Sequence, residues 1–518
     1  MQLRRSSTPA VGDNPMAAKT RPYLFYDVAI SVCSTCYRKV EAKTIFQENN
    51  VYLVKRCPQH GIERVLIADD VDYYRRCREV FIKPPEMPQV YNTPVKWGCP
   101  YDCGLCTDHE QHSCLTLVEI CDYCNLRCPV CYAASGPERQ QFRTLPQIEK
   151  MLDAVVRNEG HPDVVQLSGG EPTLHPDFFT IVDMAKARPI KHLMVNTNGV
   201  RIAQEEDFVK RLADVREDFE VYLQFDSFER EPLMQLRGAD LRRVRLDALD
   251  KLNRHNISTN LVVTLKKGLN DHEIGKTIDF ALQQPCVRGV TFQPIQDAGR
   301  LENFDPATDR LTLTEVRRKI LEQTTVFRPE DVIPVPCHPD SLAMAYALKL
   351  GGKVVPLTSM IPPEVLINGA ANTILYEQDP AVRDNLFKLF ATNHSPRSGA
   401  GTLRELLCCL PKVWIPEIAP ETTTDHVGTA ASAVQSSAAR PNSASALSYE
   451  NIFRIIIMQF IDAHSFDVRS VKKTCVHIVH PDGRLIPFDT YNLFYRDGLE
   501  TTRLTPLRRN AEAALAAI

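Results

Sequence analysis

The sequence predicts an α/β protein with six strand–helix units, a small metal-bound module before them and an α+β extension after them. Between residues 115 and 294, short apolar runs alternate with segments in which apolar residues recur every three or four positions. Polar residues or glycines directly follow most of these runs, and most of the 17 cysteines come before residue 132. Because parallel strands need helical crossovers, the alternation favours a parallel sheet whose carboxyl ends gather the functional groups.

The composition of the whole chain excludes several classes of protein. A length of 518 residues allows about two to four domains, and 44% apolar residues is ordinary for a globular protein. A formal net charge of −3 lacks the basic excess of a nucleic-acid-binding protein. No apolar run reaches the ~18 residues needed to cross a bilayer, and residues 1–22 lack the apolar core of a secretory signal. We therefore expect a disordered N-terminal tail and a cytoplasmic protein, in which clustered cysteines indicate metals rather than disulfides.

The N-terminal module, 23–95, is expected to fold around a metal ion. A C-x2-C knuckle is followed some twenty residues later by a Cys-Pro-Gln-His half-site. Two short loops at this spacing are typical of a tetrahedral zinc site or a rubredoxin-like iron site. Cys77 is the other candidate for the fourth ligand, but its charged helical surroundings favour a bystander thiol. The predicted ligands are Cys33, Cys36, Cys57 and His60.

A second cysteine group occupies residues 96–114. Its spacing, C-x3-C-x2-C-x7-C, puts four thiols in sixteen residues, with glycine and proline that let the backbone wrap around a metal. Four thiolates can saturate a cubane, so this loop predicts an auxiliary [4Fe–4S] cluster without an open iron. The alternative is a structural zinc with the same ligands. These ligands are Cys99, Cys103, Cys106 and Cys114.

The central region, 115–330, contains the six strand–helix units. Its first helix begins at Thr144 with a capping box, Thr-x-x-Gln, followed by an apolar stripe. Strands are expected at 115–120, 164–167, 192–195, 221–225, 260–265 and 289–292. Helices are expected at 144–155, 178–187, 208–212, 241–252 and 271–282.

The loop after the first of these strands carries a C-x3-C-x2-C motif at Cys124, Cys128 and Cys131. Three thiolates hold only three corners of a cubane, so the fourth iron is free to bind a small molecule. Cys121, just before the motif, is interpreted as a buried bystander, with a hydrogen donor as the alternative. Some forty residues later, the run Leu-Ser-Gly-Gly-Glu-Pro-Thr places two glycines and a carboxylate after the second strand.

Together these two motifs resemble the radical S-adenosylmethionine (SAM) superfamily. The resemblance implies a partial (β/α)6 barrel in which the open iron chelates the amino acid end of SAM. It also implies the chemistry: the reduced cluster passes an electron to the sulfonium, and the resulting 5′-deoxyadenosyl radical abstracts hydrogen from an unactivated C–H bond. An electron donor of flavodoxin or ferredoxin type is the implied partner. The alternatives are a plain electron-transfer cluster or a zinc site.

Polar residues at the strand ends are candidates to bind the cofactor. In the Gly-Gly-Glu turn, the glycines let the backbone approach closely and bond the SAM ammonium, and the carboxylate offers it a countercharge. Other polar side chains there suit ribose hydroxyls, adenine or substrate, although Asn and Asp are also common in turns. Arg237 could anchor the cofactor carboxylate, but a solvated arginine is the favoured interpretation. The predicted cofactor-binding residues are Gly169, Gly170, Glu171, Asn196, Asn198, Gln224, Asp226 and Gln293.

The C-terminal third is expected to contain a hairpin that turns at Pro481-Asp482-Gly483 and three helices. One of the helices carries Cys408 and Cys409, which are not expected to bind metal. The segments are an extension at 331–415, a disordered linker at 416–448 rich in Ala, Ser, Thr and Pro, and a helix-and-hairpin segment at 449–518. The helices are expected at 385–391, 403–413 and 452–461.

Cys337 and Cys475, together with the motifs above and the Pro-Asp-Gly-Arg hairpin, narrow the resemblance. The chain resembles the tetraether lipid synthase-like radical enzymes, some of which are described as dihydropterin methyltransferases. These enzymes carry several iron–sulfur clusters and a rubredoxin-type metal, so the resemblance implies a further cluster at Cys337 and Cys475. The sequence departs from the pattern at Ser341 and Asp489, where cysteines are expected. A full cubane would need His338, Asp489 or another group, and the alternative is two buried free thiols.

The sequence therefore predicts a radical SAM enzyme, a transferase, whose radical couples the alkyl chains of lipids carbon to carbon. The apolar runs at 385–391 and 452–461 would line an alkyl tunnel or touch a membrane surface, with simple core helices as the alternative. The second hypothesis is methylation or another modification of a pterin-like heterocycle. The third is a non-catalytic iron–sulfur electron carrier. The expected partners are a small-molecule or lipid substrate and an electron donor, without a nucleic acid.

Overall fold

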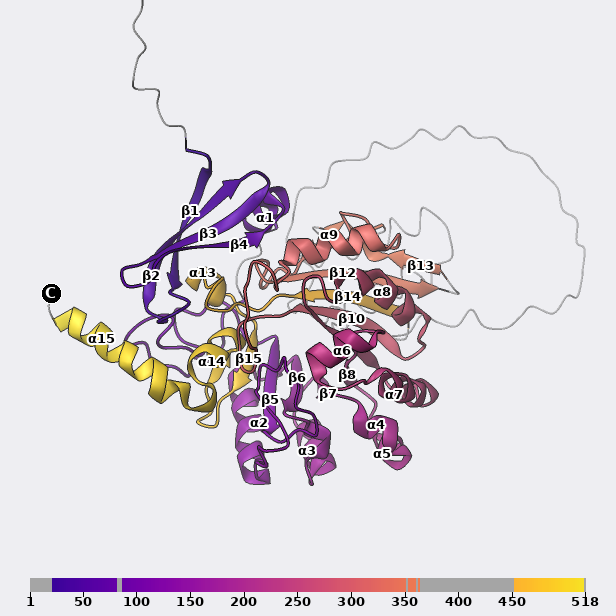
Figure 1. Ribbon diagram of the computed structural model, residues 1–518. Helices are drawn as coiled ribbons and strands as arrows, with labels where there is room; N and C mark the ends of the chain where they lie inside the picture. Colours follow the sequence, from indigo (N-terminus) through magenta and orange to yellow (C-terminus); the bar gives the residue numbers. More distant parts are fainter. Residues whose placement is uncertain (1–20, 82–85, 351–352, 360–361, 364–450, 517–518) are drawn as a thin grey trace, which may run out of the picture.

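The computed structural model describes residues 21–81, 86–350, 353–359, 362–363 and 451–516. Within these ranges the chain forms two sheets, which lie beside each other in Figure 1. The predictions for the tail up to residue 20, for the helices at 385–391 and 403–413 with Cys408 and Cys409, and for the linker at 416–448 lie outside the described residues.

The N-terminal sheet is a four-stranded antiparallel meander, drawn in indigo in Figure 1. A helix follows it and begins at Asp70, whose side chain accepts a hydrogen bond from the Tyr73 amide at 3.0 Å, a typical helix N-cap. The elements are β1 (Leu24–Val32), β2 (Lys39–Gln47), β3 (Asn50–Cys57), β4 (Gly61–Ala68) and α1 (Val71–Glu79).

The second sheet contains the six predicted strands, all parallel and in the order β10-β9-β8-β7-β6-β5. The sequence prediction of these strands is confirmed. Each strand is buried on both faces, as parallel strands covered by helices usually are. The strands are β5 (Leu115–Cys121), β6 (Val164–Gly169), β7 (His192–Thr197), β8 (Phe219–Gln224), β9 (Thr259–Leu265) and β10 (Val287–Pro294).

Helices connect these strands and cover the outer face of the sheet (Figure 1). The first of them, α2, begins with the predicted capping box, in which the Thr144 amide donates to the side chain of Gln147 at 2.8 Å. The helices are α2 (Leu145–Glu159), α3 (Phe178–Lys186), α4 (Val200–Gln204), α5 (Glu206–Asp214), α6 (Arg230–Arg237), α7 (Arg242–Arg254), α8 (Ile274–Gln283) and α9 (Leu313–Gln323), with short 3-10 turns η1 (Pro172–Leu174) and η2 (Asp271–Glu273).

The C-terminal third extends both edges of the six strands. Strand β14 (Ile452–Met458) pairs in parallel with β10, and β15 (Val476–Val479) pairs in parallel with β5. The connection between them, 459–475, therefore runs from the last strand of the set to the first. The remaining elements are β11 (Ile333–Pro334), β12 (Leu342–Leu350), β13 (Lys353–Pro356), η3 (Leu357–Ser359), α13 (Val468–Val471), β16 (Leu485–Pro487), α14 (Phe488–Phe494), η6 (Arg496–Gly498), η7 (Glu500–Leu504) and α15 (Thr505–Ala516).

The helix predicted at 452–461 is wrong, because this segment forms β14. Its near-continuous run of isoleucines is buried on both faces between β10 and β12. Short apolar runs of this kind fit a buried strand or a buried helix equally well, and β-branched residues favour the strand. The predicted hairpin is confirmed, because β15 and β16 pair antiparallel around Gly483. Within the described ranges, no helix is both long enough and apolar enough to span a membrane.

His464, in the 459–475 connection, ties the two sheets together. Its Nδ1 lies 2.8 Å from Glu63 of β4, and its Nε2 lies 3.6 Å from Asp297, just after β10. Burial alone would lower the pKa of His464, but the carboxylates of Asp297 and Glu63 outweigh it and raise this pKa to about 9. A folded pKa above the ordinary value of about 6.5 means that the charged form stabilises the fold.

We expect His464→Gln to destabilise the protein by about 2 kcal/mol at pH 6 and by much less at pH 9.5. The stabilisation is fully present below about pH 6.5 and is lost as the pH rises through 9. Melting temperatures of the two proteins across this pH range measure the effect. An equal difference at both ends of the range would contradict the assignment of charge to His464.

Candidate active site and metal centres

Cys124, Cys128 and Cys131 line one cavity of about 160 Å³ at the carboxyl ends of the parallel strands. The cavity also meets the Gly-Gly-Glu turn after β6, as the two motifs predict. Of the described residues that line it, no histidine and no fourth cysteine faces the three thiols. This donor set fits a cubane with one iron left without a protein ligand. Burial raises the pKa of the Cys124 and Cys128 thiols, so their thiolates need a metal to stabilise them.

The turn after β6 needs glycine at positions 169 and 170, because its backbone lies directly against the backbone of the cysteine loop. The amides of Gly170 and Glu171 donate to the carbonyls of Cys121 and Tyr123, each at 2.8 Å. A Cβ on Gly169 would lie 2.2 Å from the Cys121 oxygen, and one on Gly170 would lie 2.1 Å from the Tyr123 oxygen. Any larger residue would therefore push the turn away from the cysteine loop.

The carboxylate of Glu171 is buried and already has four donors. It accepts from the amide and hydroxyl of Thr173 at 3.2 and 2.6 Å, from the Thr197 hydroxyl at 2.7 Å and from the Asn198 amide at 2.7 Å. Burial raises its pKa although these donors oppose the shift. The side chain thus fixes the loops after β6 and β7 to each other, and its predicted role as a countercharge for an ammonium stays a prediction.

The prediction that Asp226 binds the cofactor is wrong, because Asp226 does not line the cavity. Its carboxylate is fully buried behind Arg237, which donates to its two oxygens at 2.7 and 2.6 Å, with Arg245 at 3.6 Å. The solvated arginine expected at position 237 is also wrong. Arg237 is only partly exposed, lines the cavity and donates to Gln224 at 2.7 Å and to Thr264 at 2.9 Å. A buried carboxylate needs such a partner, and the arginine lies eleven residues away at the end of α6.

The other predicted polar residues do line the cavity. Gln224 donates to Asn196 at 2.8 Å, and Asn198 donates to Asn125 of the cysteine loop at 2.7 Å. Gln293 donates to the Tyr222 hydroxyl at 3.1 Å. The residues concerned are Asn196, Asn198, Gln224 and Gln293.

Two further groups line the same cavity: sequence reasoning missed Gln166 and Phe488, and it placed the run 452–461 there only as the lining of an alkyl tunnel. On β6, the side-chain amide of Gln166 faces the cavity, and it has no hydrogen-bond partner within the described part of the chain. From the C-terminal third come Met458, Phe460 and Phe488, and the rings of the two phenylalanines stack at 4.0 Å. The pairing of β14 with β10 brings Met458 and Phe460 to the site, and the pairing of β15 with β5 brings Phe488, which follows β16.

Cys121 is buried and does not line the cavity. Its thiol donates to the Glu171 carbonyl at 3.5 Å, and burial raises its pKa to about 12. These contacts support the bystander interpretation over a hydrogen donor.

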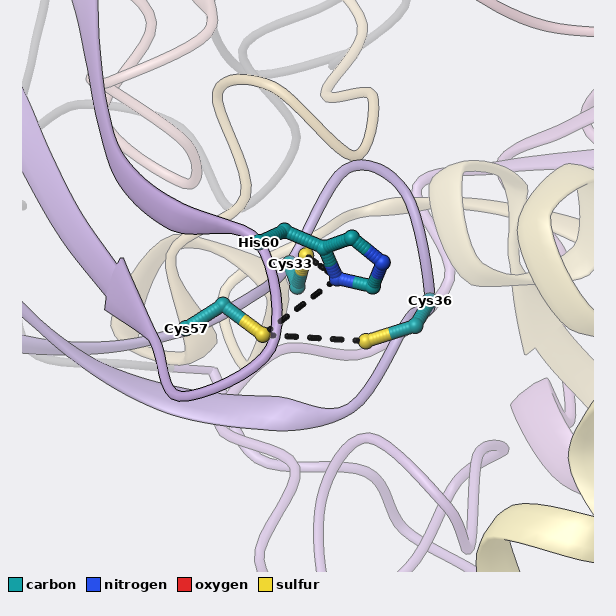
Figure 2. Close-up of side chains that lie close together, drawn as sticks. All are labelled: Cys33, Cys36, Cys57 and His60. Atoms are coloured by element: carbon teal, nitrogen blue, oxygen red, sulfur yellow. Dashed lines mark hydrogen bonds between the residues drawn. The ribbon is translucent and has the colours of Figure 1, made fainter.

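The four predicted ligands of the N-terminal module converge on one point (Figure 2). The Nδ1 of His60 lies 3.4 Å from the Cys33 sulfur and 3.5 Å from the Cys57 sulfur, and Cys36 and Cys57 are 3.8 Å apart. A tetrahedral zinc with bonds of about 2.3 Å to sulfur separates two sulfurs by about 3.8 Å. The donor set therefore fits zinc. Cys77 packs in the core with Tyr73, away from this set.

For the loop at 96–114, the prediction that Cys114 is the fourth ligand is wrong. Cys99, Cys103 and Cys106 line one small cavity with Asp108, but Cys114 lies with Cys337 and Cys475 instead. The cause is strand pairing: Cys114 directly precedes β5 and Cys475 directly precedes β15, its neighbour. An auxiliary cluster at the first three cysteines stays a prediction.

Asp489 and His338, suggested as further ligands beside Cys337 and Cys475, do not belong to this group either. The carboxylate of Asp489 accepts from the Ile461 amide at 2.7 Å and from the Thr474 hydroxyl at 3.0 Å.

Comparisons with known proteins agree with this geometry. Residues 118–281 match the model of the Radical SAM superfamily, and residues 25–69 match that of the HMPTM N-terminal zinc ribbon domain. The chain is similar to the 7,8-dihydro-6-hydroxymethylpterin dimethyltransferase of Methanocaldococcus jannaschii, with 27% identity over 92% of this chain and 96% of that protein. It is also similar to the GTP 3′,8-cyclase of Alkaliphilus oremlandii, with 26% identity over 47% of this chain and 73% of that protein.

Among solved structures, the chain is similar to Streptococcus suis SuiB bound to S-adenosylmethionine, with a TM-score of 0.34, 16% identity and coverage of 40% of this chain and 46% of that chain. It is also similar to methylornithine synthase (PylB), with a TM-score of 0.31, 17% identity and coverage of 41% and 64%. The chain thus spans about half to two thirds of the length of these structures.

Proposed function

The chain is a radical SAM enzyme with an N-terminal zinc ribbon, and from this premise we propose that its substrate is a pterin-like heterocycle, which it methylates at a C–H bond. When bound, a [4Fe–4S] cluster and SAM would supply the 5′-deoxyadenosyl radical that removes the hydrogen atom. A second SAM would donate the methyl group and leave as S-adenosylhomocysteine, with one electron from the reductant for each SAM consumed. Cys124, Cys128 and Cys131 would hold the cluster, and the backbone of the turn at 169–171 would hold the amino acid end of SAM.

The unpaired amide of Gln166 is the observation that carries the proposal. It faces the cavity from β6, near the amides of Asn196, Gln224 and Gln293 on the next strands. An amide offers both a donor and an acceptor, as the edge of a pterin ring does, so a bound heterocycle would satisfy it. The aromatic rings of Phe460 and Phe488 offer an apolar face against which a flat ring can pack.

The relatives support the same substrate class. The relative that matches nearly the whole chain is named for a dihydropterin, and the cyclases are named for GTP, whose guanine shares the pyrimidine half of a pterin. Alkyl coupling of lipids is disfavoured, because an alkyl chain would leave the Gln166 amide without a partner, and such a buried polar group costs about 1–3 kcal/mol. It enters the test below as the competing outcome.

The test uses the full chain, reconstituted anaerobically with iron and sulfide and reduced with dithionite in the presence of SAM. We expect added 7,8-dihydro-6-hydroxymethylpterin to increase 5′-deoxyadenosine formation and to yield a methylated pterin by mass spectrometry. Deuterium on the pterin should appear in 5′-deoxyadenosine. A parallel reaction receives an archaeal-type diether lipid. Stimulation by the lipid alone would overturn the proposal.

A variant of Gln166 tests the binding argument. We expect Gln166→Leu, which keeps the volume but removes the amide, to raise the KM for the pterin roughly tenfold or more, while the KM for SAM changes less. A site built to hydrogen-bond its substrate is sensitive to such a loss. Equal changes in both KM values would argue against a contact with the heterocycle.

A further inference from the structure

Three buried cysteines from distant parts of the chain meet beside the first parallel strand. Cys114 directly precedes β5, Cys337 follows β11, and Cys475 directly precedes β15. Their sulfurs lie within 4.8 Å of one another, and those of Cys337 and Cys475 are 3.4 Å apart without a disulfide. Three thiols in mutual contact, shielded from water, are a donor set for a soft or borderline metal ion.

A histidine and a carboxylate stand beside this group. The Nε2 of His112 lies 3.5 Å from the Cys114 sulfur, and its Nδ1 lies 3.0 Å from Glu159 at the end of α2. The same carboxylate accepts the Ser113 amide at 3.1 Å. Metal-binding histidines commonly use their second nitrogen in this way, with a carboxylate that sets the tautomer and the ring orientation. Gln111 also donates to the Cys114 sulfur at 3.7 Å.

The spacing of the donor atoms points to one metal ion rather than a cluster. A tetrahedral zinc separates two sulfurs by about 3.8 Å and a sulfur from a nitrogen by about 3.5 Å. The zinc-ribbon ligands of this chain show the same spacing, 3.4–3.8 Å. In a cubane each thiolate binds a different iron, which spreads the sulfurs further apart. Among the described residues, the cysteines of the radical motif form no group within 4.8 Å.

We propose that Cys114, Cys337 and Cys475 bind a second mononuclear zinc ion, with His112 as the fourth ligand. His112 is outside the group within 4.8 Å, so its ring must turn toward the other two sulfurs when the metal binds. The ring lines a cavity of about 270 Å³ with Glu86 and Glu159, which gives the ion a route of entry.

The rival for the fourth position is His338, next to Cys337. Its Nε2 is buried and has no hydrogen-bond partner among the residues that the structure describes. The geometry favours His112, because its Nε2 already lies 3.5 Å from the Cys114 sulfur, the separation expected of two ligands of one zinc, and because Glu159 orients its ring. The two assignments make opposite predictions for the two histidine variants.

The site would act as a cross-link between the C-terminal third and the catalytic domain. The Leu115 amide donates to the Cys475 carbonyl at 3.1 Å, where β15 joins β5. The metal would fix this junction and the segment after β11 at the same point. Because Phe460 and Phe488 come from the same third of the chain, the cross-link would also hold one wall of the cavity in place.

The experiment measures zinc, iron and sulfide per chain in full-length protein, reconstituted with iron and sulfide and then treated with a weak chelator. We expect two zinc ions in the wild type and one in Cys337→Ser, with iron and sulfide unchanged. A loss of about four irons and four sulfides in this variant would overturn the mononuclear assignment. No loss of any metal would overturn the site. Cys77→Ser, at a buried thiol outside both groups, is the control.

A second measurement keeps the proposal testable if Cys337→Ser does not fold. We expect Glu159→Gln to weaken the second zinc 10–100-fold in a chelator competition, the usual effect of losing the carboxylate behind a histidine ligand. His112→Gln should release this zinc, and His338→Gln should retain it. The reverse result for the two histidine variants would overturn the assignment of His112 as the fourth ligand. In cobalt-substituted protein, the thiolate-to-cobalt charge-transfer band should weaken in the same variants that lose the second zinc.

Discussion

Replacing Cys128 with alanine is expected to reduce 5′-deoxyadenosine formation to the background of a protein-free reaction. Cys128 is the middle thiol of the three that face the cavity, and two thiolates cannot hold a cubane while leaving one iron open. The loss should be chemical rather than structural, because the motif lies in a loop and the strands on either side are packed independently of it. Liquid chromatography of 5′-deoxyadenosine measures the effect, and iron analysis should show about four irons fewer than in the wild type.

Cys121→Ala is the matched control for this prediction. Cys121 lies seven residues before Cys128, is also buried and points its thiol to the Glu171 carbonyl instead of the cavity. Its removal leaves a small void and no unpaired charge, so most of the activity should remain. If both variants lost activity equally, the loop would be responding to any change in packing. If Cys128→Ala kept its iron, the assignment of the three thiols to one cluster would fail.

The features predicted correctly from the sequence are local in the chain. The three thiols that share the cavity lie within eight residues, and the four donors of the zinc ribbon lie in two short loops joined by a hairpin, so their spacing alone limits the geometry. The strand–helix alternation is likewise a local periodicity. The capping box at Thr144 even fixed the first residue of α2. For such features, little depends on how distant parts of the chain pack.

The errors concern contacts between distant segments. Cys114 lies eight residues from Cys106, and this nearness suggested a shared cluster. In the fold, strand pairing brings Cys114 to Cys475, more than three hundred residues away. The spacing of cysteines along the chain carries no information about a strand that returns from the other end of it. The resemblance placed Cys337 and Cys475 together, but only the fold could add Cys114 to them.

The polar residues at the strand ends illustrate a second limit. The sequence placed Asp226 and Gln224 correctly at the carboxyl end of β8, but it could not show that Arg237 would satisfy both. A carboxylate that is fully buried must be paired, and its partner is chosen by packing. A position at a strand end thus indicates that a residue lies near the cavity. It does not indicate whether the side chain remains available to bind a ligand.

Because a buried carboxylate must be paired, we expect the largest loss of stability on replacing Arg454 of β14. This arginine interrupts the isoleucine run for which the sequence predicts a helix, and in the fold its guanidinium donates to Glu220 of β8 inside the curved sheet. Both side chains are almost completely buried. Burial alone would raise the pKa of Glu220, but Arg454 and His192 outweigh it and lower this pKa, so the pair is ionised. We expect Arg454→Met to destabilise the protein by about 3–5 kcal/mol, because it leaves the buried carboxylate of Glu220 without its guanidinium countercharge.

The double variant Glu220→Leu/Arg454→Met separates this cause from simple loss of packing. Removing both charges should restore most of the stability, since an apolar pair of similar volume is often as stable as a buried ion pair. Arg243→Met, which breaks the exposed pair with Asp247, should change stability by less than about 0.5 kcal/mol. Apparent melting temperatures and urea midpoints of the four proteins measure these differences. A double variant as unstable as Arg454→Met would mean that β14 is held to the six strands by the shape of these side chains and not by their charges.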